Sequence, residues 1–201
     1  MKVCIDPGHG GADVGAISQH NGLHEADAVL DIALRLKELL TPYVEIVMTR
    51  DKDVFIPLHE RARIANANEC DAYVSIHLNS ASSNARGWEV YSSIGQTQGD
   101  KLTKCIASRH AETFPNQKVR GIKEASYYVL RHTNMPASLW EGCFLSNEEE
   151  AGWVSFSDVR QAMAEALCLG IMDFCGIEKS KTVLSLEERV ARIEDHLNMK
   201  N

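Results

Sequence analysis

Two histidines and one carboxylate have the residue types of a catalytic metal site. His9 lies in the glycine-rich stretch 6–11, which directly follows the short apolar run 2–5. His77 closes a second apolar run, and Glu25 lies at the start of a predicted helix. Zinc bound by two histidines and one carboxylate keeps an open fourth position for water. A single loop histidine would support no such prediction, so the hypothesis of a hydrolytic zinc site rests on the three residues together.

Glu141 is the candidate for proton transfer. It lies in the apolar segment 137–145, next to Trp140. Charged side chains are seldom buried unless they are paired or functional. Burial raises the pKa of a carboxyl group toward neutrality, as a general base or acid requires. Glu25 also has a purely structural interpretation, because a carboxylate in the first turn of a helix complements the helix dipole.

Five other polar residues each have two interpretations. Asn79 follows the second apolar run and could either contact substrate or form a turn. Arg61 and Arg63 could bind substrate carboxylates, although solvated or structural ion pairs are the expected role. His24 and His132 could also contact substrate, but we expect both on the surface.

The six cysteines contain no C-x-x-C pair, which argues against a zinc finger or a thioredoxin-like motif. Most lie in apolar segments, and we expect reduced core residues rather than disulfides. Cys143 lies two residues after Glu141, so a regular strand would place both side chains on one face. A cysteine nucleophile is nevertheless disfavoured against the metal mechanism.

The hydrophobic pattern predicts strands that alternate with helices. Val29, Ile32, Leu36 and Leu40 recur at helical spacing, whereas the segment 71–77 is almost wholly apolar and typical of a central strand. Predicted strands cover 2–6, 44–48, 71–77, 87–91, 127–130 and 137–145, predicted helices cover 24–40, 57–68, 98–114 and 157–175, and 116–126 is predicted as loop. This order indicates an α/β fold, a single mixed, largely parallel twisted sheet of about six strands with helices on both faces, plus a short C-terminal helix. Sites in such sheets form at the carboxyl ends of strands, where both candidate histidines lie.

The chain is expected to divide at Gly176. Residues 1–176 form the expected catalytic domain, and residues 177–201 begin with the polar linker 178–182 and continue with a predicted helix over 185–198. The apolar residues of that helix follow a coiled-coil spacing. They are Leu186, Val190, Ile193 and Leu197. Because so short a helix is not stable alone in water, we expect residues 185–198 to pack on another surface, with homo-oligomerisation favoured over folding back.

Length and charge limit the classes of partner. The 201 residues are enough for one full-sized core. A formal net charge of -7 argues against a nucleic-acid partner. No stretch is long and apolar enough for a membrane span. Met1 and Lys2 are followed at once by a predicted strand rather than by a signal peptide, so we expect synthesis in the cytoplasm without a leader.

Six motifs that occur in order along the chain resemble those of one enzyme family. They are Asp6-Pro-Gly-His-Gly-Gly11, Gly22-Leu-His-Glu-Ala-Asp27, Thr49-Arg-Asp51, Leu58-His-Glu-Arg-Ala-Arg-Ile-Ala-Asn66, Ser75-Ile-His-Leu-Asn79 and Glu141-Gly-Cys-Phe-Leu-Ser-Asn147. Over about residues 2–175 the chain resembles the zinc-dependent N-acetylmuramoyl-L-alanine amidases of the Amidase_3 type, phage endolysins among them. The resemblance implies that His9, Glu25 and His77 are the zinc ligands and that Glu141 is the catalytic carboxylate.

The resemblance also implies a substrate and a setting. The substrate is peptidoglycan, and the amide cleaved joins the lactyl group of N-acetylmuramic acid to L-alanine of the stem peptide. An endolysin that reaches the wall after holin-type release or lysis is the expected setting, and a sporulation or germination amidase is the nearest variant. The alternatives are a zinc peptidase that cuts within the stem peptide and a peptidoglycan-binding module without turnover. Trp140 and Cys143 depart from the expected smaller or aliphatic neighbours of Glu141, which concerns packing rather than proton transfer.

Overall fold

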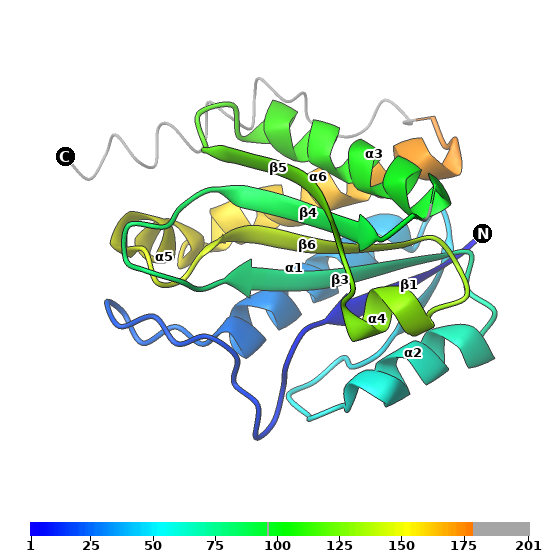
Figure 1. Ribbon diagram of the computed structural model, residues 1–201, viewed down its shortest axis with the longest axis horizontal. Coiled ribbons are helices and arrows are strands. Elements are labelled where there is room, and N and C mark those ends of the chain that lie inside the picture. The colour runs from blue at the N-terminus through cyan, green and yellow to red at the C-terminus, as the bar shows by residue number, and fades with distance from the viewer. Residues whose placement is uncertain (96, 179–201) are drawn as a thin grey trace.

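A computed structural model describes residues 1–95 and 97–178 of the chain. The strands are β1 (Lys2–Pro7), β2 (Glu45–Met48), β3 (Ala72–Asn79), β4 (Trp88–Ser93), β5 (Val119–Ala125) and β6 (Ala137–Phe144). The helices are α1 (Glu25–Leu40), α2 (Leu58–Ala67), α3 (Thr97–Thr113), α4 (Tyr128–His132), α5 (Glu148–Val154) and α6 (Ser157–Cys175). Figure 1 shows one twisted sheet with helices packed around it, as predicted.

The sheet has the strand order β2-β1-β3-β6-β4-β5. β1 pairs in parallel with β2 and with β3, β3 pairs in parallel with β6, and β4 pairs in parallel with β5. β4 runs antiparallel to β6, so the sheet is mixed and mostly parallel, and that prediction is confirmed. Because β1 and β3 are parallel neighbours, the residues at their carboxyl ends lie side by side.

The helices bury two separate clusters of apolar side chains, one on each face of the sheet. α1, α3 and α6 pack on one face, where the larger cluster includes Ile5, Ile76 and Trp140. α2 and α4 contribute to the smaller cluster on the other face, around Tyr73 and Leu139. The prediction of helices on both faces is therefore confirmed. The smaller cluster matters for the site, because two of its members, Val129 and Leu139, line the same cavity as His9 and His77.

Two predictions between residues 116 and 130 are wrong. The segment 116–126, predicted as loop, contains β5, and the segment 127–130, predicted as strand, belongs mostly to α4. β5 is an edge strand whose side chains are largely exposed, so its sequence shows no apolar alternation. In α4, Val129 and Leu130 are buried in the smaller cluster, and this packing outweighs the strand propensity of the neighbouring tyrosines.

α5 forms in a stretch for which the sequence predicts no element. Its N-cap residue Asn147 accepts a hydrogen bond from the backbone N–H of Glu150 at 3.1 Å, and acidic residues fill its first turn. Both features stabilise a helix N-terminus, and they are the signal in the sequence that could have located α5.

The C-terminal end of α6 agrees with the prediction. Gly176 caps the helix with a φ of 68°, in the left-handed region that glycine favours. Residues 179–201, which contain most of the predicted linker and the predicted helix over 185–198, lie outside the described residues. Within the described part of the chain, no helix has the length and apolar character that crossing a membrane requires. All six cysteines lie in the described part of the chain and are free thiols, as predicted.

Candidate active site

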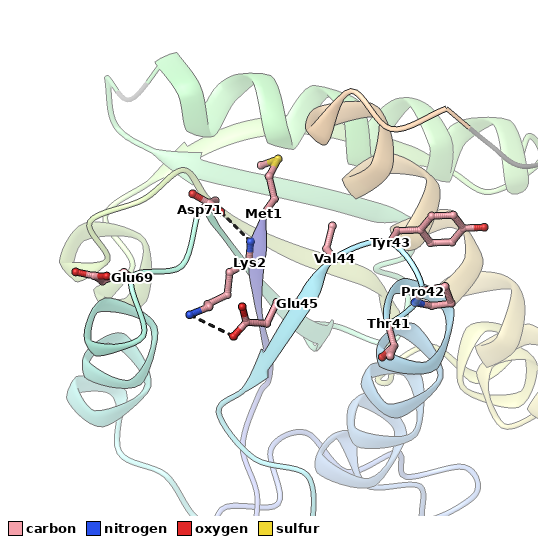
Figure 2. Close-up of a pocket in the computed structure, with 9 residues that line it drawn as sticks. All are labelled: Met1, Lys2, Thr41, Pro42, Tyr43, Val44, Glu45, Glu69 and Asp71. Carbon is pink, nitrogen blue, oxygen red and sulfur yellow. Dashed lines mark hydrogen bonds and ion pairs between the residues drawn. The ribbon is translucent and has the colours of Figure 1, made fainter.

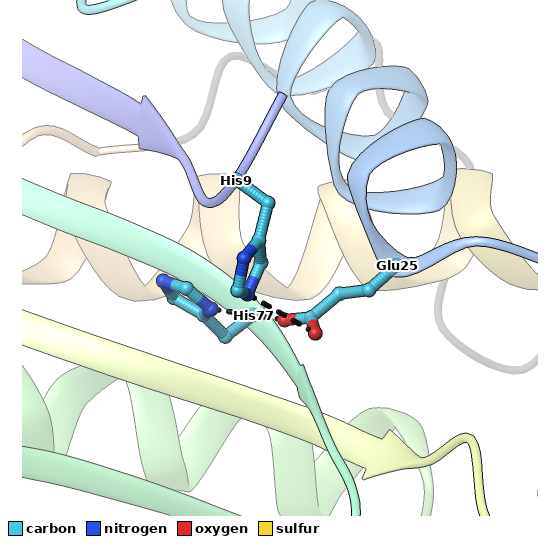
Figure 3. Close-up of side chains that lie close together, drawn as sticks. All are labelled: His9, Glu25 and His77. Atoms are coloured by element: carbon cyan, nitrogen blue, oxygen red, sulfur yellow. Dashed lines mark hydrogen bonds and ion pairs between the residues drawn. The ribbon is translucent and has the colours of Figure 1, made fainter. Parts of the chain in front are cut away.

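Three side chains from three separate segments meet at the carboxyl ends of β1 and β3. His9 follows β1, His77 lies in β3, and Glu25 begins α1 (Figure 3). Glu25 Oε2 lies 3.1 Å from His9 Nε2, and Glu25 Oε1 lies 2.9 Å from His77 Nδ1. One candidate ligand atom from each residue lies within 4.8 Å of the other two. The structure thus brings the predicted set together at a spacing that a single cation could bridge.

Neighbouring polar groups orient these three side chains. Asp13 Oδ1 lies 2.9 Å from His9 Nδ1, while the other nitrogen of His9 faces Glu25. The backbone N–H groups of Leu78 and Ala16 donate to Glu25 Oε1 and Oε2, each at 3.0 Å. A carboxylate on the remote nitrogen of a histidine is a common arrangement around protein metal ions. Asp13 is not among the residues predicted from the sequence, where its one signal is its place four residues after His9.

Two glycines let the backbone approach the rings closely. A Cβ atom at Gly8 would lie 2.2 Å from the ring of His77, and one at Gly15 would lie 2.7 Å from both Glu25 Oε2 and His9 Cδ2. No side chain larger than hydrogen therefore fits at either position without displacing a candidate ligand. His9 itself has a φ of 59°, a conformation that is costly for a residue with a Cβ and concentrated at functional sites.

The buried carboxylate of Asp6 holds the turn after β1. It accepts hydrogen bonds at 2.5–2.8 Å from one guanidinium and three hydroxyl groups, those of Arg61, Thr49, Tyr73 and Ser75. Burial raises the pKa of Asp6, but the charge of Arg61 and the hydroxyl hydrogen bonds hold it below its ordinary value of 3.8. Arg61 also donates to the backbone oxygen of His9 at 2.6 Å. Asp6 and Arg61 thus fix the backbone that carries His9.

Glu141 lies beside this set, on the strand next to β3. The register of β3 and β6 places Glu141 directly opposite His77. Its Oε2 atom is buried, and no hydrogen bond from the described residues reaches it. Burial raises the pKa of Glu141 to about 7, and the charges of Glu25 and Glu89 act in the same direction against that of His77. A pKa near neutrality is what a group that both accepts and returns a proton requires.

An irregularity in β6 separates Cys143 from Glu141. Directly after the pair of His77 and Glu141, three steps along β6 (141 to 144) match two steps along β3 (77 to 79). Such a bulge disturbs the alternation of side chains between the two faces. Cys143 therefore packs with Trp140 in the larger core cluster, and the prediction that it shares the face of Glu141 is wrong. Burial also raises the pKa of the Cys143 thiol, which makes it a poor nucleophile.

The electrostatics of the centre favour a positive charge. Burial alone would lower the pKa of His77, but the hydrogen bond and the charge of Glu25 raise it to about 9. The same carboxylate raises the pKa of His9 against the effect of burial. Burial opposes ionisation of Glu25, yet the two rings lower its pKa. A centre that stabilises added protons in this way can stabilise a divalent cation instead, and two nitrogens with one carboxylate fit zinc.

A cavity of about 520 Å³ adjoins the centre on the face that α2 and α4 cover. Its lining includes His9, His77 and Glu141, so substrate bound there would meet the chemical groups directly. The lining also carries apolar and aromatic side chains that are exposed to solvent. They are Phe55, Leu58, Tyr127 and Tyr128. A mostly apolar cavity with a few convergent polar groups is typical of a substrate site.

A second hollow, of about 660 Å³, lies at the amino-terminal end of β1 (Figure 2). Lys2 already contacts two of its acidic residues, because Lys2 Nζ lies 3.3 Å from Glu45 Oε1 and the Lys2 backbone N–H donates to Asp71 at 2.7 Å. Its lining contains no histidine. Sites in α/β sheets form at the opposite ends of the strands, so chemistry and topology both favour the smaller cavity near His9.

Asn79, a predicted substrate contact, has both ends of its amide engaged within the protein. Its Nδ2 donates to Glu89 Oε1 at 2.6 Å, and its Oδ1 accepts from the backbone N–H of Ser80 at 2.8 Å. The geometry therefore links Asn79 to a buried carboxylate beside Glu141 rather than leaving its amide open toward the cavity. Glu89 is not among the residues predicted from the sequence, where its signal is a carboxylate within the predicted strand 87–91.

The remaining candidates have the expected structural roles. Arg61 is buried in its ion pair with Asp6, and Arg63 pairs on the surface with Glu60 at 2.5 Å. His132 is exposed, and the side chain of His24 is 40% exposed. The prediction of structural ion pairs and surface histidines is therefore confirmed.

The sequence of the chain matches a described protein family over most of its length. The family model for N-acetylmuramoyl-L-alanine amidase matches residues 3–173. An endolysin of Bacillus phage SPP1 is 38% identical over 88% of this chain and 67% of the relative. The sporulation-specific N-acetylmuramoyl-L-alanine amidase of Bacillus subtilis strain 168 is 32% identical over 90% of this chain and 71% of the relative.

Solved structures agree with the sequence match. The catalytic domain of CwlV, an N-acetylmuramoyl-L-alanine amidase from Bacillus (Paenibacillus) polymyxa var. colistinus, has a TM-score of 0.84 at 30% identity, over 88% of this chain and 99% of that chain. The N-acetylmuramoyl-L-alanine amidase AmiC2 of Nostoc punctiforme has a TM-score of 0.83 at 35% identity, over 88% of this chain and 97% of that chain. Sequence, fold and the arrangement of the site agree, and the chain belongs to the N-acetylmuramoyl-L-alanine amidase family of peptidoglycan-hydrolysing enzymes.

Proposed function

We propose that the chain uses zinc to hydrolyse the amide between the lactyl group of N-acetylmuramic acid and L-alanine of the stem peptide. His9, Glu25 and His77 would hold the zinc, and Glu141 would be the catalytic carboxylate. The observation that carries the proposal is the convergence of these four residues, from four separate segments of the chain, in a protein of this family.

The protein groups have distinct roles in this proposal. Zinc in such a site acts as a Lewis acid that activates water and polarises a carbonyl. Glu141 takes the proton of the attacking water and returns it to the amine of L-alanine as that amine leaves. Asp13 holds the ring of His9 in one orientation. The aromatic lining of the cavity would hold substrate groups beside the scissile amide and limit the access of bulk water.

Digestion of muramyl peptides, followed by mass analysis, tests this function. The expected products are a lactyl-ended glycan and a peptide with a free L-alanine amine. New amines within the stem peptide would identify a zinc peptidase, and no product from the folded, zinc-loaded chain would identify a binding module. Removal of zinc with a chelator should abolish the products, and added zinc should restore them.

We propose a cell-wall lytic role of the endolysin or autolysin type. The chain would be synthesised in the cytoplasm and reach peptidoglycan after holin-type release or lysis. The phage endolysin relative supports this setting, and the sporulation-specific relative supports the nearest variant. Expression inside a susceptible bacterium tests the release step, since lysis is expected when a holin is co-expressed and not without it.

We also propose that residues 177–201 form an association element, separate from the catalytic domain of residues 1–176. The coiled-coil spacing over 185–198 supports this proposal. Two catalytic domains joined in this way would bind a polymeric wall with higher avidity than one. In sedimentation experiments at micromolar concentration, the full chain is expected to be a dimer or larger, and a version ending at Gly176 a monomer. Monomers in both samples would rule out self-association.

A further inference from the structure

Two cationic side chains from β5 share one buried carboxylate beside Glu141. Glu89 of β4 lies directly opposite Glu141 in the sheet register. Its Oε2 accepts hydrogen bonds from Arg120 Nε at 2.9 Å and from Lys123 Nζ. The side chain of Glu89 is 4% exposed, whereas those of Arg120 and Lys123 are 31% and 38% exposed. Glu89 is thus paired with two cations, although the formal net charge of the chain is -7.

Glu89 is held firmly enough to act as an anchor for both cations. Asn79 Nδ2 donates to its other oxygen, Oε1, at 2.6 Å. Burial raises the pKa of Glu89, but hydrogen bonds from Lys123, Arg120 and Tyr91 outweigh burial. The pKa therefore lies below its ordinary value of 4.5, and the carboxylate is ionised. A single cation would neutralise this charge. Lys123 can do so, which leaves the donors of Arg120 that Glu89 does not use for an anion from outside the protein.

The guanidinium of Arg120 is fixed in place but still has free donors. Its Cζ lies 4.8 Å from the ring centroid of Phe144, and its Nε is used by Glu89. Among residues 1–95 and 97–178, no hydrogen bond or ion pair engages Nη1 or Nη2. These two nitrogens form a planar fork that matches a carboxylate with two parallel hydrogen bonds. Because two contacts already restrict the side chain, an anion would bind it with little further loss of conformational freedom.

The position of this fork fits one part of the substrate. Arg120 starts on β5, extends past β4 and lies over Phe144 of β6, the strand that carries Glu141. Neighbouring strands are about 4.8 Å apart, and an extended peptide advances about 3.3–3.6 Å per residue. A stem peptide that runs from Glu141 toward β5 would therefore bring a group one or two residues beyond the scissile amide to the fork. L-Alanine, the first residue, has no free carboxylate within the stem peptide.

We propose that Arg120, anchored by Glu89, binds a free carboxylate on the second residue of the stem peptide. Lys123 supplies the charge that keeps Glu89 neutralised when Arg120 engages the substrate. Arg120 is then a specificity-determining residue that distinguishes an acid from an amide at this position. The inference rests on the proposed amidase function, because that reaction places the stem peptide next to Glu141.

A pair of substrates tests the proposal. Two muramyl peptides are compared that differ only in a carboxylate or a carboxamide at the second residue. The intact enzyme is expected to favour the acid by about tenfold or more in kcat/KM, the scale of a charge-assisted hydrogen-bond pair. Arg120→Gln should remove this preference by raising KM for the acid, with little change for the carboxamide. Arg120→Lys keeps the charge without the fork and should retain part of the preference.

A matched control separates local binding from net charge. Lys104→Gln removes the same charge from an exposed position on α3, the helix packed on the other face of the sheet, and should leave the preference unchanged. Arg120→Gln should still fold, because Glu89 keeps its bonds to Lys123 and Asn79, and its melting temperature checks this. An Arg120→Gln variant that folds and retains the full preference for the acid would overturn the proposal.

Calorimetric binding distinguishes failure of this inference from failure of the amidase assignment. Zinc-loaded Glu141→Gln is titrated with each uncleaved peptide, with and without Arg120→Gln. Tighter binding of the acid that depends on Arg120 would support the subsite even if digestion showed cleavage at another bond. Equal affinity for the two peptides would overturn the subsite even if digestion confirmed the amidase reaction.

Discussion

Replacing His77 by alanine is expected to remove zinc and activity together. The intact chain should hold about one zinc, and His77→Ala should hold little after dialysis, because two ligands do not form a stable site. Amide hydrolysis should fall by more than about 10²-fold, since both water activation and carbonyl polarisation depend on the metal. Glu25, which lies 2.9 Å from His77 Nδ1, would also lose a partner while it remains buried. Elemental analysis of the purified variant and a rate measurement on muramyl peptide are the two readouts.

His59→Ala is the matched control for that experiment. His59 is exposed on α2 and does not line the cavity, so this variant should keep both its zinc and its rate. Full zinc occupancy in purified His77→Ala would show that the ligand assignment is wrong. Loss of zinc without loss of activity would instead show that the reaction does not use this centre.

Glu141→Gln is expected to separate catalysis from metal binding. The amide has nearly the shape of the carboxylate but cannot accept the proton of the attacking water. The rate should therefore fall by at least about 10²-fold, the usual contribution of a positioned acid–base group. Zinc content should stay at the wild-type level, because Glu141 lies opposite His77 but is outside the cluster of candidate ligands. The rate is measured at saturating muramyl peptide, beside elemental analysis of the same sample.

Glu38→Gln, at an exposed position of α1, provides the matched control. It removes one carboxylate charge far from the cavity lining and should change neither the rate nor the zinc content. A near-normal rate for Glu141→Gln would exclude this residue from proton transfer. In that case the buried oxygen of Glu141 that lacks a hydrogen bond in the described structure would need a structural explanation.

The parts of the fold that can be predicted from the sequence are those with a strong local pattern of apolar residues. The apolar runs of β1 and β3 and the helical spacing of α1 locate His9, His77 and Glu25 at element ends, which was sufficient to predict their convergence. β5 has no such pattern, because an edge strand with exposed faces does not select apolar residues. α4 is short, and its helical state depends on burial against the smaller cluster rather than on local preference.

The parts of the site that were missed depend on pairing between distant segments. Glu89 acts beside Glu141 because β4 and β6 are antiparallel neighbours, a register that no local motif encodes. Arg120 reaches the same place from β5, which was predicted as loop. The position of Cys143 depends on a bulge in β6 that regular alternation does not anticipate. Sequence therefore identified the residues at element ends, while the supporting residues became apparent from the strand order.

The stability of the turn that carries His9 depends on pH, because it depends on the ionised carboxylate of Asp6. Because the pKa of Asp6 is lower in the folded chain than its ordinary 3.8, its contribution to stability is complete above that value and is lost as the pH falls through the folded-state pKa. Protonation there would leave the buried guanidinium of Arg61 without its counter-charge. Above that ordinary value this pair stays intact, so activity lost in moderate acid should return on neutralisation. Stronger acid would unfold the turn itself, and recovery would then require the chain to refold before it could bind metal again.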